Sequence, residues 1–446
     1  MKRLDATLLL PISFAVLIAA GTAALSLPVA WGEGREVSVL DAFFTATSAV
    51  CVTGLVTVDT ARAWSPFGQG VILALIQLGG LGLLTFSTFF FVLSGRPMSL
   101  SQRNVMARSH GKLTRIELRG LVVRIVTYAL VIELVGAAIL SMFFMRETGS
   151  TSTGLWQGLF HAVSAFCNAG FSLFSNSLEG YSGSWLVNLT VMGLVVLGGI
   201  GFIVITDVEA RLRHQKRLSF HSKIVLAATA VLLLVGAGGF FLFEADNVLR
   251  GRPWDEQLLM VLFQSVTPRT AGFNTAPYGD LANSTLMMTM ILMFIGGSPG
   301  SAAGGIKTST ATILWALLLS KARGFRQAVL FRRAVPERIV GEAMAVVLLS
   351  VFVIMTMTFL LQWTELGGLA HPGVRGDFLS LNFEAVSAFG TVGLSMGETF
   401  SLRPLSKLII IVLMFVGRLG PLLVAVAIGG RRHKRYEVAE EAVLVG

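Results

Sequence analysis

The chain has few charged residues, which make up 13% of its 446 positions, whereas roughly 25% is usual in a soluble domain. Hydrophobic residues make up 54%. A chain of this composition has too little polar surface to remain dissolved on its own. The shortage of charge therefore argues against a soluble globular protein and indicates an integral membrane protein.

Cysteine is also scarce, since Cys51 and Cys167 are the only two and lie far apart. Such a pair implies neither a disulfide framework nor a cysteine-based metal site. Histidine does not occur deep in any long apolar run, and an intramembrane enzyme would need a nucleophile with a base in reach. We therefore expect no enzyme and no resident cofactor in this chain.

What the chain does contain is a fourfold internal repeat. Each copy is a short apolar stretch that ends in glycine and is followed at once by a large apolar residue. The copies are FTATSAVCVTGL at 44–55, FHAVSAFCNAGF at 160–171, FQSVTPRTAGF at 263–273 and FEAVSAFGTVGL at 383–394. A repeat of this kind defines the architecture before any residue is given a role.

Long apolar runs flank every copy of the repeat. Runs of the roughly 20 residues that a membrane span requires fall at 6–30, 68–93, 120–145, 185–208, 222–243, 283–319, 339–363 and 404–428. The segments between paired runs, at 41–51, 156–167, 255–267 and 378–389, are too short to cross but can enter and return. We predict an all-α integral membrane protein with eight transmembrane helices and four re-entrant pore helices. They form four tandem helix–pore-loop–helix repeats around a pseudo-fourfold axis.

The predicted units occupy 1–95, 96–210, 211–325 and 326–430, and a tail follows at 431–446. Most of the 35 Lys and Arg residues fall at the N-terminus, in the links between units at 94–119, 209–223 and 320–338, and in RRHKR at 431–435. By the positive-inside rule these segments and both termini face the cytoplasm of a cell whose plasma membrane the chain crosses. The net charge of +10 thus serves orientation and contact with membrane lipid, and we expect no nucleic acid partner.

A minority of the basic residues, Arg269 among them, are expected on the opposite side, where the re-entrant segments enter. Arg124, Lys307 and Arg418 are expected at membrane depth. Glu133 also lies within a span, and nine residues separate it from Arg124, so the sequence does not pair them. His161 and Glu384 occupy the same place in two copies of the repeat, and we expect them to face an outer vestibule.

The turn of each repeat is suited to binding a cation. A re-entrant segment leaves backbone carbonyls without helical partners, which is tolerated in a membrane only where they line water or bind something. Glycine permits backbone angles that aim carbonyls inward, and four such turns around one axis make rings of oxygens that can replace the hydration shell of an alkali ion. We name these the filter turns: Val52, Thr53 and Gly54; Asn168, Ala169 and Gly170; Thr270, Ala271 and Gly272; Thr391, Val392 and Gly393.

The second helix of each unit carries a glycine pair, at LGGLG 78–82, LGGIG 197–201 and IGGSPG 295–300, but VGRLG at 416–420 has Arg418 in place of the second glycine. The third unit continues into GGSPGSAAGG at 296–305, which cannot stay helical. We predict a gate below the filter turns, built from this loop and the arginine: Gly296, Gly297, Ser298, Pro299, Gly300, Gly304, Gly305 and Arg418. The alternatives are a packing kink for the loop and a structural pin for Arg418.

Taken together, the filter turns, the glycine-rich break and the arginine resemble the Trk/Ktr/HKT superfamily of potassium transporters. The chain starts directly with its first unit, and in this it is similar to the KtrB-type membrane subunit. The resemblance implies K⁺ uptake with K⁺ as the transported ion and Na⁺ as a candidate activator. It also implies a homodimer and a cytoplasmic nucleotide-binding regulatory ring similar to KtrA or TrkA.

One other class of function stays open at this point. A coupled secondary carrier could move another small substrate by alternating access between repeats. Such a carrier is expected to have broken helices in symmetry-related units, whereas this sequence predicts a single broken helix, in the third unit.

Overall fold

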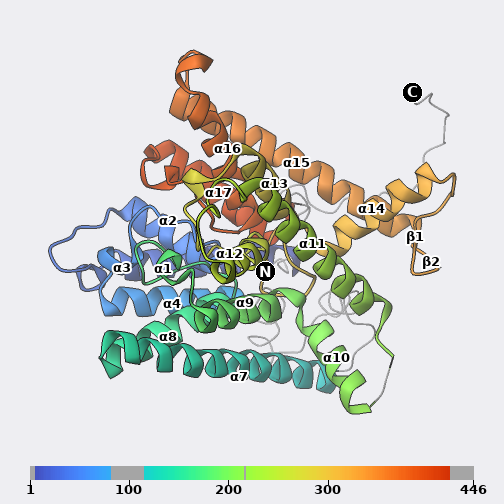
Figure 1. The fold of residues 1–446 in the computed structure, drawn as a ribbon, viewed down its shortest axis with the longest axis horizontal. Coiled ribbons are helices and arrows are strands. Elements are labelled where there is room, and N and C mark those ends of the chain that lie inside the picture. The colour runs from blue at the N-terminus through green and yellow to red at the C-terminus, as the bar shows by residue number, and fades with distance from the viewer. Residues whose placement is uncertain (1–5, 82–114, 215–216, 422–446) are drawn as a thin grey trace, which may run out of the picture.

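The structure, a computed structural model, describes residues 6–81, 115–214 and 217–421 as a mostly helical protein (Figure 1). Three predicted segments lie outside the described residues: the tail at 431–446 with RRHKR, the rest of the second predicted span and most of the first link. The helices are α1 (Ala6–Leu25), α2 (Val39–Val50), α3 (Thr60–Ala63), α4 (Pro66–Gly80), α7 (Arg115–Thr148), α8 (Thr151–Phe166), α9 (Trp185–Ile200), α10 (Phe202–His214), α11 (Phe220–Glu244), α12 (Trp254–Val266), α13 (Asn283–Phe294), α14 (Thr308–Ala322), α15 (Glu337–Leu366), α16 (Arg375–Gly390) and α17 (Pro404–Leu419). A two-residue hairpin, β1 (Val329–Leu330) with β2 (Arg333–Ala334), follows α14.

Short helices occupy all four segments that were predicted to be re-entrant. These helices are α2, α8, α12 and α16, and each ends just before a filter turn. Serine caps begin two of them, where Ser38 accepts a hydrogen bond from the backbone N–H of Asp41 and Ser150 accepts one from Thr153. Such caps satisfy N–H groups that the first helical turn leaves free. The prediction of a short helix in each of these segments is confirmed.

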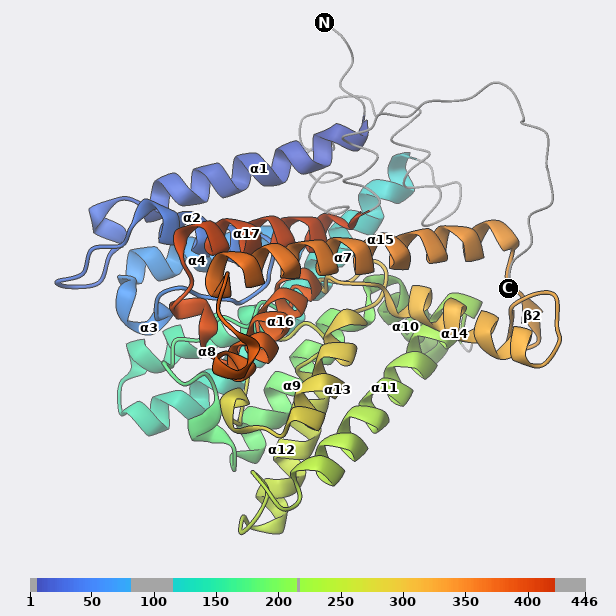
Figure 2. The ribbon, with the colours of Figure 1, turned by 90° about the horizontal axis from the view of Figure 1, so that it is seen from above.

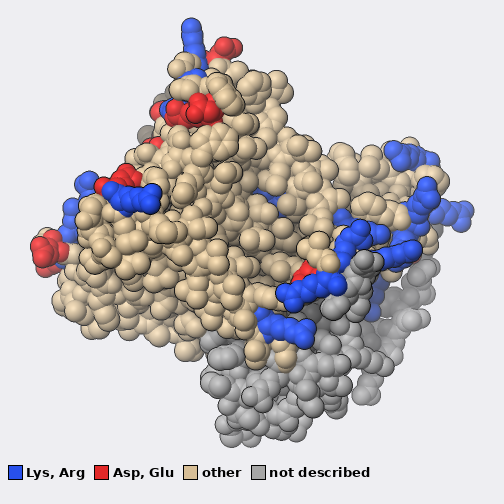
Figure 3. Space-filling model, turned by 60° about the horizontal axis from the view of Figure 1, so that its bottom comes forward, with Lys and Arg blue, Asp and Glu red and all other residues tan. Residues whose placement is uncertain are grey.

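Apolar helices of membrane-spanning length are present, which supports an integral membrane protein. In the described part of the chain three helices pass by length and composition, within α7, α11 and α15, and α9 with α10 makes a fourth if the bent pair is one span. Figure 3 shows Lys and Arg gathered at the end of the molecule that carries α14 and the hairpin, with a broad surface almost free of charge beside them. The all-helical membrane class is thus as predicted.

The second helix of the second unit departs from the prediction. It was expected to run unbroken over 185–208, but α9 and α10 meet at 100°. Gly201 stands at the bend with φ +95°, and the N–H of Phe202 donates to Gly300 O of the glycine-rich loop at 3.1 Å. The prediction of a single broken helix was wrong, because the loop supplies a hydrogen bond that competes with helix continuation.

The first and last units meet, so that the row of repeats closes on itself. Helix α17 packs against α2, and Figure 2 shows the two side by side. Lys407 of α17 also forms an ion pair of 2.7 Å with Asp41 at the start of α2. Both side chains are mostly buried, 14% and 15% exposed, so the pair is better shielded from water than a surface salt bridge.

Second helices pack tightly against the ends of the short helices through their first glycine. A Cβ atom on any of these glycines would come closer than 3.0 Å to a backbone carbonyl oxygen. The pairs are Gly79 with Val50, Gly198 with Phe166 and Gly417 with Phe389. In these three units the shared glycine register therefore marks a packing contact that sets the second helix against its own short helix, whereas Gly296 of the third unit meets Gly304 O of the glycine-rich loop.

Candidate functional site

The four filter turns come together in one ring. A Cβ atom on each filter glycine would lie closer than 3.0 Å to the carbonyl oxygen of the middle residue in the next turn. The contacts run from Gly54 to Ala169, from Gly170 to Ala271, from Gly272 to Val392 and from Gly393 to Thr53. The turns thus follow one another around an axis in the order of the chain.

Each filter turn has the same backbone conformation, with positive φ at its first and third residues. The first residues have φ of 55° at Val52, 58° at Asn168, 68° at Thr270 and 50° at Thr391. Left-handed backbone costs a residue with a Cβ roughly 1–2 kcal/mol, and it is a genuine outlier for β-branched valine or threonine. Strain repeated at four matched positions points to a functional constraint, and sequence patterns had indicated only the glycines.

The N–H groups of the turns are directed back toward the short helices. Ser48 accepts the N–H of Thr53 on its carbonyl at 2.8 Å and that of Gly54 on its hydroxyl at 3.0 Å. Ser387 does the same in the fourth unit. In the second and third units Ser164 and Thr267 accept one N–H on their carbonyls and donate their hydroxyls to the residue after the glycine.

The carbonyl groups of the turns remain free. In the described part of the chain, none of the twelve carbonyl oxygens of the filter turns accepts a hydrogen bond from the protein. Buried carbonyls without partners are uncommon. A ring of them at the C-terminal, negative ends of four helices is suited to a desolvated cation.

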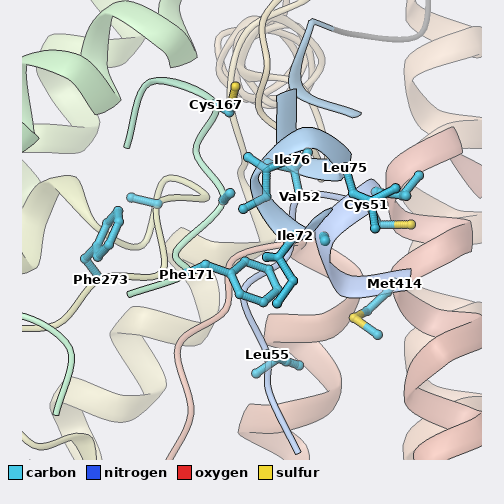
Figure 4. Close-up of a cluster of buried hydrophobic side chains, with 14 of the residues drawn as sticks. Cys51, Val52, Leu55, Ile72, Leu75, Ile76, Cys167, Phe171, Phe273 and Met414 are labelled. Atoms are coloured by element: carbon cyan, nitrogen blue, oxygen red, sulfur yellow. The ribbon is translucent and has the colours of Figure 1, made fainter. Parts of the chain in front are cut away.

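A large apolar side chain anchors each turn on the side of the glycine. These residues, each at most 1% exposed, are Leu55, Phe171, Phe273 and Leu394. Figure 4 shows the first three close to the turns, with Val52 beside Ile72 and Ile76 of α4. Burying side chains of this size stabilises the fold by about 1.5–3 kcal/mol each, which helps to offset the backbone strain.

A cavity of about 180 Å³ lies over the four glycines and is called the vestibule here; its lining includes Asp59 and Glu179. Glu179 accepts a hydrogen bond from the Asn274 amide at 2.6 Å. Burial raises the pKa of Glu179 above its ordinary value, and Asp280 adds to the rise while the Asn274 bond opposes it. The vestibule therefore offers negative charge directly above the ring of carbonyls.

The glycine-rich loop lies against the opposite face of the ring. It is not helical between α13 and α14. The N–H groups of Ser298 and Ala302 donate to the carbonyls of Gly199 and Gly198, at 3.0 and 3.1 Å. Gly304 approaches Thr391 so closely that a Cβ would collide with the threonine hydroxyl. The loop is thus held between the second and fourth units directly beneath the filter turns.

Arg418 is tied to this loop. Its guanidinium donates to Ala302 O of the loop and to Gly79 O of α4, both at 2.5 Å. Lys307 donates to Ala303 O at 2.7 Å. No carboxylate pairs with Arg418 anywhere in residues 6–81, 115–214 and 217–421, so the loop carbonyls are its counterpart.

Several predicted positions differ from the structure. Arg269 does not face the side where the short helices enter; it is 7% exposed at the end of α12 and donates to Thr229 O at 3.3 Å. Glu133 has Gln77 as a partner, with N–O distances of 2.9 and 3.1 Å. Cys51 and Cys167 are both free thiols and buried.

His161 and Glu384 do not face the vestibule. Both are 0% exposed, and their hydrogen bonds go to the chain that follows their own filter turn. The prediction was wrong because the chain after each filter turn covers these side chains and supplies their hydrogen-bond partners.

These features define a class. A helical membrane protein in which four helix ends present free carbonyls around one axis, beneath an acidic cavity, has the construction of a cation transport protein.

The chain belongs to the TrkH family: the family model described as "Cation transport protein" matches residues 7–430. The chain is 37% identical to the potassium/sodium uptake protein NtpJ of Enterococcus hirae, over 100% of this chain and 98% of that protein. It is 40% identical to the Ktr system potassium uptake protein B of Bacillus subtilis, over 93% of this chain and 90% of that protein. The chain is thus a multi-pass membrane transporter of the Ktr/Trk potassium uptake family.

The fold agrees with this membership. The crystal structure of the potassium transporter TrkH from Vibrio parahaemolyticus matches with a TM-score of 0.72 at 20% sequence identity, covering 95% of this chain and 84% of that one.

Proposed function

We propose that this chain takes up K⁺ through the ring of backbone carbonyls formed by the four filter turns. The observation that carries the proposal is the free ring itself: within the described residues its twelve carbonyls accept no hydrogen bond, while most N–H groups of the same turns donate to their own short helix. Carbonyl oxygens can replace the water that K⁺ sheds on entry. The vestibule is the outer mouth, where Asp59 and Glu179 concentrate cations.

The architecture that serves this function is fourfold. Eight spans and four pore helices surround one pore, in units at 1–95, 96–210, 211–325 and 326–430. The matched turns, matched glycine contacts and closure of α17 on α2 support the arrangement. The termini and the basic links lie on the cytoplasmic side of the plasma membrane, in line with the Lys and Arg gathered at one end in Figure 3.

The gate consists of the glycine-rich loop and Arg418. The loop runs beneath the filter turns, and the arginine bonds to it on one side and to α4 on the other. A positive side chain beside the path repels K⁺, and a loop without helical bonds can move at lower cost than a helix. Ions pass when the loop withdraws.

Partners complete the system. Three relatives carry the words "Ktr system" in their names, which supports a partner subunit. We take this partner to be a cytoplasmic nucleotide-binding regulatory ring that acts on the gate, with the chain itself as a homodimer. The name of NtpJ describes uptake of potassium and sodium, which supports an interaction of Na⁺ with the system; we take its role here to be that of an activator. A cysteine at Arg326 in the link after α14 should crosslink to the ring, whereas capture of lipid alone would speak against that contact.

Ion flux tests the function directly. Protein reconstituted in liposomes should take up K⁺ and Rb⁺ faster than Na⁺, and the gene should restore growth of a strain that lacks K⁺ uptake at low K⁺. Serine in place of each filter glycine should reduce the preference for K⁺. Equal uptake of the three ions by the wild type, or no effect at all four glycines, would refute the proposal.

A further inference from the structure

A polar side chain recurs behind the filter turns at one fixed place in the repeat, three residues before the serine or threonine that accepts the turn N–H groups. We call it the rear position. It is occupied by Thr45, His161, Gln264 and Glu384, which are at most 3% exposed. A buried polar group costs free energy unless it has hydrogen-bond partners. The four side chains differ, so their partners show what the position does.

In the fourth unit Glu384 receives three hydrogen bonds from the chain just after the filter glycine. Ser395 Oγ and the N–H of Met396 donate to one carboxylate oxygen, at 2.5 and 3.1 Å, and Thr399 Oγ1 donates to the other at 2.5 Å. Bonds from several donors to one buried carboxylate are stronger than neutral ones. Ser395 also lines the vestibule, so the carboxylate holds the wall of the outer mouth from behind.

The second unit repeats this arrangement with a different side chain. His161 Nε2 accepts from Ser172 Oγ at 3.0 Å and from the N–H of Leu173 at 3.3 Å. Its Nδ1 lies 2.8 Å from the carbonyl oxygen of Gln157, so the network places the ring proton there. The serine and the N–H stand two and three residues after the filter glycine, as in the fourth unit.

In the other two units the rear position makes neutral hydrogen bonds or none. The Gln264 amide lies 2.6 Å from the Tyr278 hydroxyl and 3.3 Å from Thr275. Thr45 is too short to reach the segment after its own turn, and its hydroxyl has no partner in the described part of the chain. Val56 stands where Ser172 and Ser395 stand in the second and fourth units.

We propose that Glu384 is a positioning residue for ion selectivity. It fixes the segment after Gly393 and so the spacing of the carbonyls in the fourth filter turn, and His161 does the same in the second. Neither residue touches the ion. The inference rests on the proposed function, because it needs the filter turns to be the site of selection.

The test compares matched positions of the repeat in liposomes, with K⁺ and Na⁺ uptake measured for each variant. Glu384→Ala should lower the K⁺ to Na⁺ uptake ratio by roughly tenfold, since it leaves buried donors unpaired, and His161→Ala should lower it less. Glu384→Gln should keep most of the ratio, because its amide oxygen can accept from Ser395 and Met396 while Thr399 accepts from its NH₂. Thr45→Val is the control and should leave the ratio unchanged.

If Glu384→Ala does not assemble, Ser395→Ala and Thr399→Val remove the same bonds from the other side and should shift the ratio in the same direction. A wild-type ratio in Glu384→Ala and in Ser395→Ala would overturn the inference. An equal loss in Thr45→Val would do so as well, since that variant breaks no hydrogen bond to the segment after the turn. Serine at Gly393 separates this failure from that of the proposed function: it should lower the ratio even if Glu384 does not matter.

Discussion

The two faces of the ring differ in their symmetry. Above and within it the four units are alike: every turn has positive φ at its first and third residues and is tied to its own short helix through a serine or threonine. Beneath it the units differ, since the third unit supplies an unwound loop and the fourth an arginine. Selection by coordination needs oxygens on all sides of an ion, whereas blocking the path needs one obstacle.

The difference has a consequence for sequence change. Each filter turn contacts the next one around the ring. A substitution in one turn therefore distorts its neighbours, so that a change in one unit can impair ion coordination by all four. A substitution in the gate affects one loop and one arginine, which the third and fourth units supply and which have no counterpart in the other two units. The first kind should change which ion passes, and the second should change how much passes.

The largest effect is expected for Gly393→Ser in the ring. The new Cβ would meet Thr53 O in a residue with φ +92°, and left-handed backbone alone costs about 1–2 kcal/mol. We expect nearly complete loss of discrimination between K⁺ and Na⁺, measured as the ratio of their uptake rates in liposomes. Gly193→Ser, where a side chain meets nothing within 4 Å, is the matched control and should behave as the wild type.

The contacts between successive filter turns explain which features of the ring the sequence could predict and which it could not. The repeat placed the short helices and the four glycines, because tight turns and short apolar segments leave local signals. It did not reveal positive φ at the first residues of the turns, since valine and threonine do not favour it and only Asn168 is of a type that adopts it readily. That conformation is imposed by the neighbouring turns, which come from distant parts of the chain.

Beneath the ring the sequence was less informative for the same reason. Composition predicted the unwound loop, because glycine and proline cannot maintain a helix there. The bend at Gly201 depends on Gly300, about a hundred residues away, and nothing near Gly201 signals it. The burial of Arg269 and the pairing of Glu133 with Gln77 likewise depend on tertiary contacts between segments that are distant in sequence.

A smaller effect, on flux instead of selectivity, is expected for Arg418→Gln. At about 6 Å and an effective dielectric near 20, the arginine repels K⁺ by about 3 kcal/mol, on the order of a hundredfold in occupancy. We expect K⁺ flux to rise by about tenfold when this repulsion is removed. Arg418→Lys keeps the charge and should keep most of the barrier. Lower flux in correctly assembled Arg418→Gln protein would identify the residue as a structural pin.

Shortening the loop from Ser298 to Ala303 should raise flux by a few-fold, because it removes the backbone that lies against Gly198 and Gly199. It also removes the Ala302 carbonyl that holds Arg418. The double variant should therefore exceed either single one by less than the product of their effects, as expected for groups in contact. Independent effects in uptake assays would mean that the arginine and the loop act separately.

The smallest effect is expected in the vestibule, where Glu179 lies above the ring. Its raised pKa means that it loses its negative charge at a higher pH than an ordinary glutamate, so its attraction for cations falls as the pH is lowered toward the range in which an ordinary glutamate titrates. Uptake at low K⁺ should fall by less than about twofold over that range, and less still at high ionic strength, which screens an exposed charge. Glu179→Gln should start at the lower rate and lose part of the pH dependence. Asp246→Asn, which removes an exposed carboxylate outside the vestibule lining, should retain the wild-type profile. A profile unchanged by Glu179→Gln would show that Glu179 does not concentrate cations at the outer mouth, and would leave Asp59 as the carboxylate of the vestibule lining that can do so.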